Sequence, residues 1–219
     1  MAVVSIASAK GGCSKTTIAI LVGAELALDG YRVAILDCDL NQHASAFGLK
    51  AKLPTFAVIP DIGEKEVLKA LRQAEAEHDV VLLDLPGGSS TLSLKAMQRS
   101  HFVLVPTRAS LPDARDAMKT VAQIDDAEEL ARTPIPRALA WTLLRSGFES
   151  KVARYVRKSL EAEDVPILKS ALMDRAAFQA IHLNGKVPRQ VEPNGAAAGN
   201  VAALTREVME RLKVKEEVA

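Results

Sequence analysis

Short apolar runs alternate with longer amphipathic segments from one end of the chain to the other. The short runs are rich in Val, Leu, Ile and Ala and are bounded by polar or turn-forming residues, as is typical of buried strands. They span residues 3–8, 32–36, 55–59, 79–84, 101–106, 136–144 and 165–168. Strands that alternate with helices predict an α/β fold, doubly wound, with a mostly parallel sheet and helices on both faces.

Helical patterns fill the segments between the strands. They span residues 16–28, 63–77, 150–163, 175–183 and 199–214, with a further helix capped by Ser89 or Ser90 and another that begins near Pro112. Ser150 is expected to cap the helix over 150–163. Neither an internal repeat nor a break in composition indicates a second domain, so we expect residues 1–219 to form a single domain.

The amino-acid composition indicates the kind of core and the cellular compartment. Only 4 % of the residues are aromatic although 48 % are hydrophobic, so the core is expected to be aliphatic. Cys13 and Cys38 do not make a disulfide framework, so a reducing compartment is the simpler context, and we expect both thiols to be buried or inert. The start of the chain lacks a basic leader, and no apolar run reaches the ~18 residues that a membrane-spanning helix requires. We therefore expect a cytoplasmic protein.

The stretch ASAKGGCSKTT, residues 7–17, follows the first strand and resembles a phosphate-binding loop. Lys15 and Thr16 supply the final letters of the P-loop pattern G-x-x-x-x-G-K-[ST], whereas Ala9 and Ser14 stand where it has glycines. Such a loop presents backbone N–H groups to phosphate oxygens at the start of a helix. The candidate nucleotide-binding residues are Lys10, Gly11, Gly12, Cys13, Ser14, Lys15, Thr16 and Thr17.

Three carboxylates follow strands that should neighbour this loop. Asp37 and Asp39 end the second strand, and Asp84 ends the apolar run DVVLLD. The ends of parallel strands meet at one edge of a sheet, where ligands bind. An acidic residue after a strand is a common ligand of nucleotide-bound Mg²⁺. A helix cap or a turn is the common alternative for each one, but three such residues beside a phosphate loop are less easily explained by chance.

These residues resemble a known family. KGGCSKTT, residues 10–17, is similar to the deviant Walker A motif KGGxGKTT of the ParA/MinD class of P-loop ATPases. The resemblance extends to DCDLNQHAS after the second strand, to VVLLDLPGG, which is like that family's Walker B segment, and to VPTRASLPDARDA after the fifth. RAAFQAIHLNGKVP is similar, more weakly, to its C-terminal region.

The resemblance implies roles for individual residues. The lysine at the position of Lys10 crosses a dimer interface to the partner's nucleotide, while Lys15 binds the chain's own phosphates. Thr16 would bind Mg²⁺, with Asp37 and Asp84 supporting the metal through water, and Asp39 would orient the attacking water. Lys10, Lys15 and Asp39 are the candidate catalytic residues. ATP binding would then drive formation of a homodimer, and hydrolysis would end it.

Ser14 departs from the family pattern, which has glycine there. If this backbone is left-handed, serine costs roughly 1 kcal/mol relative to glycine. The loop can tolerate serine with weaker binding, or it can bind ATP and misplace the γ-phosphate so that hydrolysis is slow or absent. We expect nucleotide binding that is retained but weakened.

Charge divides the chain unevenly. Residues 1–130 carry a net charge of −4 and residues 131–219 a net charge of +5, which together give the overall +1. ParA-type proteins bind DNA without sequence preference through basic C-terminal residues, and an ordinary solvated helix face is the alternative. The candidate DNA-binding residues are Arg145, Lys151, Arg154, Arg157, Lys158 and Arg189.

The last helix separates two subclasses of the family. A MinD-like protein ends in a basic amphipathic helix that enters membranes, whereas here Leu204, Val208 and Leu212 form a narrow stripe before the acidic pair Glu216-Glu217. Core packing is therefore the simpler explanation, and no membrane partner is expected.

The resemblance implies an ATPase that uses ATP and Mg²⁺, associates with the nucleoid and positions a plasmid, chromosome or protein cargo with a ParB-like adaptor. Two alternatives stay open. One is a nucleotide-gated DNA-binding switch with little hydrolysis, because of Ser14. The other is a metabolic P-loop ligase.

Overall fold

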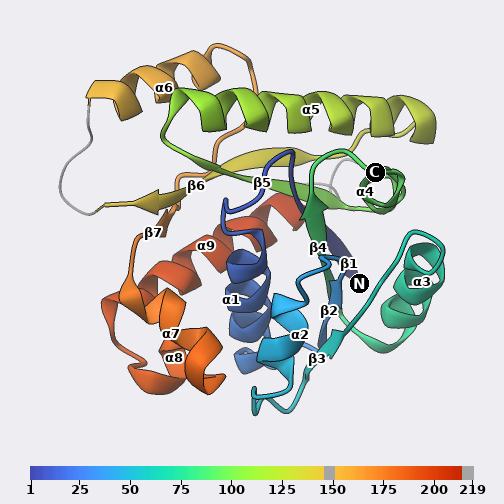
Figure 1. The fold of residues 1–219 in the computed structure, drawn as a ribbon. Helices are drawn as coiled ribbons and strands as arrows, with labels where there is room; N and C mark the ends of the chain where they lie inside the picture. Colours follow the sequence, from blue (N-terminus) through green and yellow to red (C-terminus); the bar gives the residue numbers. More distant parts are fainter. Residues whose placement is uncertain (146–150, 214–219) are drawn as a thin grey trace.

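The computed structural model describes residues 1–145 and 151–213, and within them seven strands form a single sheet (Figure 1). The strands are β1 (Ala2–Ser8), β2 (Val33–Asp37), β3 (Phe56–Ile59), β4 (Val80–Gly87), β5 (Phe102–Arg108), β6 (Arg137–Leu144) and β7 (Leu172–Met173). Their order across the sheet is β3-β2-β4-β1-β5-β6-β7, and every pair of neighbours is parallel. The predicted doubly wound, parallel α/β fold is confirmed.

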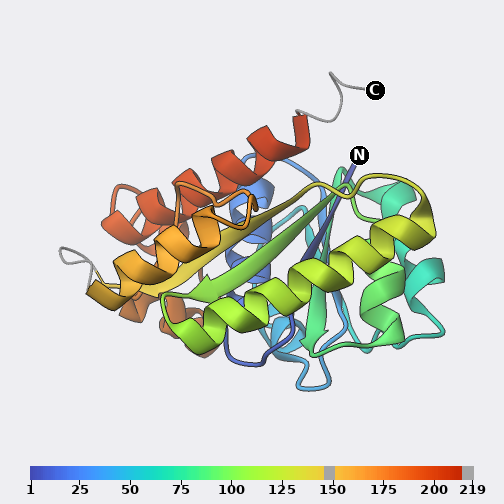
Figure 2. The same ribbon diagram turned by 90° about the horizontal axis from the view of Figure 1, so that it is seen from above.

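Helices cover both faces of the sheet (Figures 1 and 2). One face carries α1 (Lys15–Leu28), α2 (His43–Gly48), α7 (Ala176–Asn184), α8 (Pro188–Val191) and α9 (Ala196–Lys213). The other carries α3 (Val67–Glu77), α4 (Thr91–Met97), α5 (Leu111–Ala131) and α6 (Lys151–Glu161).

The central strands are buried on both sides, which explains why they read as continuous apolar runs rather than as alternating patterns. In β1, Val4 and Ile6 pack into the core that contains α1 and α9, whereas Val3 and Ala7 pack into the core of α3 to α6. The stripe of Leu204, Val208 and Leu212 on α9 is also buried, as the sequence predicted.

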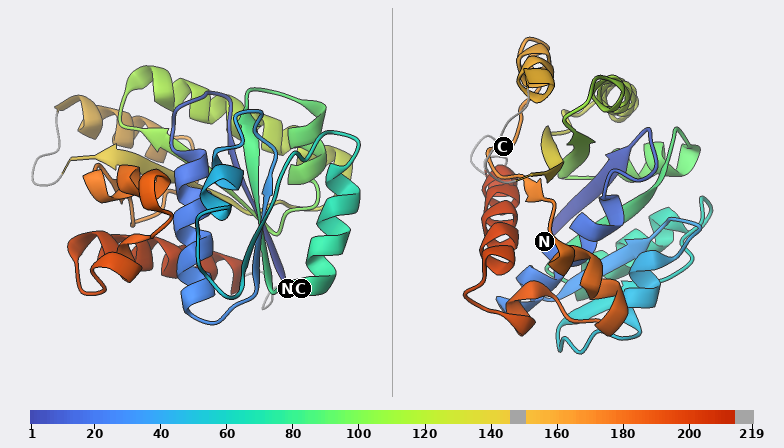
Figure 3. Two further views of the ribbon diagram at one scale, coloured as in Figure 1. Left: turned by 60° about the horizontal axis from the view of Figure 1, so that its bottom comes forward. Right: turned by 60° about the vertical axis from the view of Figure 1, so that its left-hand side comes forward.

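The strand order creates a switch point beside β1. From β1 the chain crosses to β2 on one side, and after β4 it returns to β5 on the other. The loops after β1 and β4 therefore lie next to each other at the carboxyl edge of the sheet (Figure 3). Ligands of doubly wound folds bind at such a point.

Three expectations about elements were wrong or incomplete. Residues 165–168 do not form a strand: Ile167 makes one isolated bridge to Leu139, and the edge strand β7 comes later, at Leu172–Met173. The short helices α2 and α8 were not predicted, and α3 begins at Val67 rather than Gly63. Ser90 does cap α4, accepting a hydrogen bond from the backbone N–H of Ser93. The expected cap at Ser150 lies outside the described residues.

Candidate nucleotide-binding site

The loop between β1 and α1 places the predicted phosphate-binding residues at the switch point of the sheet. Gly12 and Ser14 both have left-handed backbones, each with a φ of 74°. Ser14 is the N-cap of α1, and its side chain makes no capping hydrogen bond. Because a non-glycine residue in this region costs roughly 1–2 kcal/mol, the loop contains strain that glycine would not have.

Lys15 lies against the inner side of this loop. It is only 6 % exposed, and its Nζ donates to the carbonyl oxygen of Lys10 over 3.3 Å. The Sγ of Cys13 lies 3.5 Å from the same carbonyl, also as a donor. An ammonium group is thus held within a glycine loop at a helix N-terminus, an arrangement that favours a phosphate.

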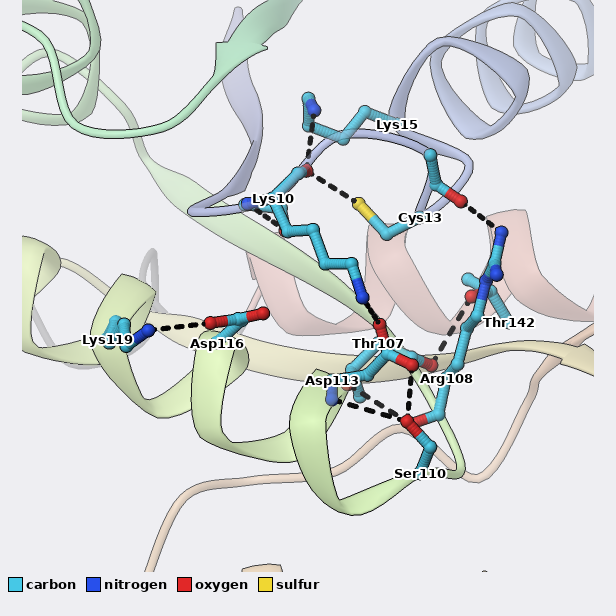
Figure 4. A network of polar contacts seen from close by, with 12 residues as sticks. Lys10, Cys13, Lys15, Thr107, Arg108, Ser110, Asp113, Asp116, Lys119 and Thr142 are labelled. Atoms are coloured by element: carbon cyan, nitrogen blue, oxygen red, sulfur yellow. Dashed lines mark hydrogen bonds and ion pairs between the residues drawn. The ribbon is translucent and has the colours of Figure 1, made fainter.

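Lys10 points out of the loop toward α5 (Figure 4). Its Nζ lies 2.8 Å from Oδ1 of Asp113, and the hydrogen bond to that carboxylate raises the pKa of Lys10 above its usual value. Arg108, the last residue of β5, donates from its guanidinium to the carbonyl oxygen of Gly12. Neither Arg108 nor Asp113 was assigned a role from the sequence, although both lie in the stretch VPTRASLPDARDA.

Asp84 is the buried carboxylate of the site. It is fully buried, and neither of its side-chain oxygens has a hydrogen-bond partner among the described residues. Burial raises its pKa to about 7; the nearby Thr16 hydroxyl opposes the rise and the charge of Asp37 adds to it. The positive charge of Lys15 and the Thr16 hydroxyl offset the cost of burying this carboxylate only in part, so a further cation beside it would stabilise its charge.

Asp37 lies beside Asp84 in the register of β2 and β4, and it is also fully buried. Unlike Asp84, it is satisfied within the chain. Its Oδ2 accepts hydrogen bonds from the backbone N–H of Ser45 at 2.8 Å and from the Ser45 hydroxyl at 2.7 Å. These bonds anchor α2, so Asp37 has a structural role in addition to any role near a metal.

The residues present fit a magnesium ion that arrives with a nucleotide. Mg²⁺ is held in such sites by one or two carboxylates together with hydroxyl, phosphate and water oxygens. In residues 1–145 and 151–213, no group of three His, Cys, Asp or Glu side chains could hold a metal ion alone. Asp84, with two unpartnered oxygens near Thr16, can supply the protein's share.

Asp39 lies in the loop that follows β2, partly exposed at the same edge of the sheet. Its Oδ1 accepts hydrogen bonds from the backbone N–H and the side-chain amide of Asn41, at 2.9 and 2.8 Å. Its negative charge contributes to the raised pKa of Asp84, so the two carboxylates interact electrostatically.

Comparison with known proteins assigns the family. The sequence matches the VirC1 protein family over residues 1–212. The chain belongs to the VirC1 family. This membership places it in the ParA/MinD class of P-loop ATPases, which the residues of the loop predicted.

Relatives match over nearly the whole VirC1-family chain. Protein ParA of Rhizobium radiobacter is 29 % identical over 217 residues, covering 97 % of this chain and 98 % of the relative. The chromosome-partitioning ATPase Soj of Thermus thermophilus is 27 % identical, with 96 % of each chain covered. The solved structure of apo McdA from Cyanothece superposes with a TM-score of 0.80 at 16 % identity, covering 97 % of this chain and 99 % of that one, which shows a shared fold.

A cavity of about 180 Å³ opens beside the phosphate loop of the VirC1-family protein. Ser14 and Thr17 line one side, and the ends of β6 and β7 and the first turns of α7 line the other. Leu143 lines it in a left-handed conformation, with a φ of 54°, at an irregularity in the pairing of β6 and β7. No pattern along the chain indicates this cavity, because residues distant in sequence form it.

The helix α6, which carries most of the predicted DNA-binding cations, lies on the opposite face of the sheet from α1 (Figure 1). Val156 and Leu160 are buried, while Lys151, Arg154 and Lys158 are exposed. Val152, one turn before Val156, is 56 % exposed. The guanidinium of Arg157 lies 5.5 Å from the ring centroid of Trp141, so part of its surface is used in packing. Arg145 is exposed at the end of β6.

Arg189 lies apart from the other predicted DNA-binding residues, which are on α6 and at the end of β6. It lies on α8 and pairs with Glu25 at 3.0 Å and Asp29 at 2.6 Å, near the end of α1. No helix in residues 1–145 and 151–213 of the VirC1-family protein is long and apolar enough to cross a membrane.

Proposed function

We propose that this chain binds ATP with Mg²⁺ as a single-domain ATPase, and that two copies enclose two nucleotides in a sandwich dimer. The observation that carries the proposal is the pairing of a glycine loop and buried Lys15 with Asp84, whose two oxygens have no partner in the described residues. A cationic loop beside an unsatisfied carboxylate suits a metal–triphosphate, which supplies both anion and cation.

Each residue of the site would have its own role in nucleotide binding or hydrolysis. Backbone N–H groups of the loop and Lys15 would bind the phosphates, and Thr16 and Asp84 would hold Mg²⁺, which lowers the negative charge of the phosphates when bound. Asp39 would orient the attacking water. Lys10 would leave Asp113 and reach the partner's nucleotide, where a cation is most effective once water is excluded.

The dimer would bind DNA without sequence preference and position a cargo on the nucleoid. The support is the set of exposed cations on α6, together with relatives named for partition. A ParB-like adaptor would stimulate hydrolysis. Because a two-copy assembly doubles the cationic surface, DNA binding should depend on nucleotide and fall steeply with salt.

One measurement tests the central claim. The mass in solution is determined by light scattering with and without a non-hydrolysable ATP analogue, for the native chain, for Lys10→Ala and for the control Lys119→Ala, which removes an exposed lysine paired with Asp116. The analogue should double the mass of the native and control chains but not of Lys10→Ala. Doubling that survives Lys10→Ala would remove the role given to Lys10.

The left-handed Ser14 favours a second candidate, a nucleotide-gated DNA-binding switch with little turnover. A strained loop can bind phosphates and still misplace the γ-phosphate. Phosphate release measured with and without DNA separates the two, because the switch would show nucleotide-dependent DNA binding at a negligible turnover rate.

A further inference from the structure

The strained half of the phosphate loop is held from outside by β5. In the described residues, one side chain hydrogen-bonds to the backbone between Gly11 and Ser14, and that side chain is Arg108 at the carbonyl of Gly12 (Figure 4). A Cβ built on Gly12 would lie 3.9 Å from Nη2 of Arg108, which confirms how closely the guanidinium approaches.

The backbone of Arg108 is anchored in the sheet. It is paired with Thr142 in the register of β5 and β6, and its carbonyl accepts the backbone N–H of Ser110 over 2.8 Å. The start of the loop is tied to the same side of the molecule, since the N–H of Ala9 donates to Thr120 on α5 over 2.8 Å. The β5–α5 segment therefore holds the loop at its start and at Gly12.

This brace, the hydrogen bond from Arg108 to the Gly12 carbonyl, is needed because Ser14 has a left-handed backbone. Strained backbone conformations persist only where their surroundings hold them, and the Ser14 side chain supplies no cap of its own. A charged donor on a carbonyl forms one of the stronger hydrogen bonds in proteins. Fixing the Gly12 peptide keeps the neighbouring N–H groups aimed at the position of a phosphate.

We propose that Arg108 is a positioning residue of the nucleotide site, which holds the phosphate loop in its binding conformation and compensates for serine at position 14. This inference rests on the proposed function, because it assumes that the loop binds a nucleotide. It adds a residue that acts through the loop backbone rather than by touching the phosphates.

The first test needs no nucleotide. The amplitude of backbone motion is measured by ¹⁵N NMR relaxation at residues 12–15 in the native chain, in Arg108→Ala and in Arg115→Ala, a matched loss of one exposed arginine from α5. Arg108→Ala should lower the order parameters of these residues from about 0.85 to below about 0.6 while those of the α1 core stay unchanged, and Arg115→Ala should change neither. Unchanged order parameters in Arg108→Ala would overturn the brace.

The second test measures coupling with Ser14. Calorimetry with a non-hydrolysable ATP analogue and Mg²⁺ should show that Arg108→Ala weakens binding about tenfold in the native chain but only about twofold in Ser14→Gly, because glycine adopts the left-handed conformation without the brace. An equal loss in both backgrounds would mean that Arg108 acts as a charge on the ligand, and the proposal would fall.

The two tests distinguish a failure of this inference from a failure of the proposed function. If the native chain and Arg115→Ala both fail to bind the analogue, the proposed function is wrong, while the order parameters still decide whether Arg108 braces the loop.

Discussion

Lys10 and Asp113 form an ion pair within one chain, with 2.8 Å between Nζ and Oδ1. Hydrogen bonds from Lys10 and Ser110 hold the pKa of Asp113 below its usual value although burial of the carboxyl opposes this. In the single chain, Lys10, which is proposed to reach the partner's nucleotide, is therefore paired with a residue of its own α5. In the proposed dimer this pair would have to break, so we expect the pair to disfavour the dimer.

Replacing Asp113 by asparagine should ease dimer formation. Because Lys10 is exposed, the pair is a weak one, and Asp113→Asn should lower the analogue concentration at half-dimerisation by about two- to fivefold. Asp116→Asn, on the same helix, removes the same charge but leaves the Lys10 contact intact and should change little. Light scattering across an analogue titration measures both. A higher midpoint in Asp113→Asn would show that the pair helps the dimer instead.

Ser14→Gly should relieve the strained N-cap of α1. The left-handed φ of 74° costs serine roughly 1–2 kcal/mol, and the greater freedom of glycine in the unfolded chain returns part of this. We expect a gain of about 0.5–1 kcal/mol in the free energy of unfolding, seen by denaturant titration, and tighter binding of ATP with Mg²⁺ in calorimetry. Ser14→Ala keeps the Cβ and should gain nothing. Equal affinity and turnover in the native chain and in Ser14→Gly would refute the strain argument.

The sequence predicted those features that local pattern determines. Valine-rich runs indicated the buried strands, and the order of glycines and lysines indicated the loop, because both depend on neighbouring residues. The left-handed conformation of Ser14 could be anticipated, since glycine normally occupies that position in the family.

Features that depend on tertiary contacts were missed. The helix α2 has six residues, too few for a periodic pattern, and it is held by the bonds from Ser45 to Asp37. Arg108 and Asp113 are 96 and 103 residues from their partners in the loop, so only the fold brings them there. The mistaken strand over 165–168 was an apolar run whose Leu168 packs into a core beside a single bridge.

Asp84→Asn should stabilise the nucleotide-free protein at alkaline pH. Burial raises the folded-state pKa of Asp84 from 3.8 to about 7, so the folded chain binds this proton more tightly than the unfolded chain. The free energy of unfolding should therefore fall as pH rises from about 4 to about 7. In EDTA at pH 8, Asp84→Asn should be more stable by roughly 2–4 kcal/mol, with a flatter pH profile.

Asp37→Asn is the matched control for this change. The same substitution on the neighbouring strand weakens charge-assisted bonds from Ser45, so it should destabilise the protein by about 1–2 kcal/mol. Denaturant titrations between pH 4 and 8 measure both variants. If Asp84→Asn were destabilising at pH 8 without metal, the carboxylate would have a partner that the structure does not show.

Replacing the exposed lysines of α6 by alanine should weaken DNA binding and reduce its salt dependence, because salt dependence measures the number of phosphate contacts. Lys151 and Lys158 lie on the surface of α6, whereas Arg157 packs on Trp141 and its loss would also disturb β6. For Lys151→Ala/Lys158→Ala, the slope of log affinity against log salt should become shallower by about 4, since the proposed dimer loses two lysines from each copy and each phosphate contact releases about one counterion.

The control for α6 is Lys65→Ala/Lys69→Ala, which removes the same charge at and just before α3, over the opposite end of the sheet. Anisotropy of labelled duplexes of unrelated sequence, with the ATP analogue present, gives the affinities at several salt concentrations. The α6 variant should lose affinity equally for all sequences, because backbone contacts carry no sequence information. An unchanged salt slope, or an equal change in the α3 control, would show that α6 is not the DNA-binding surface.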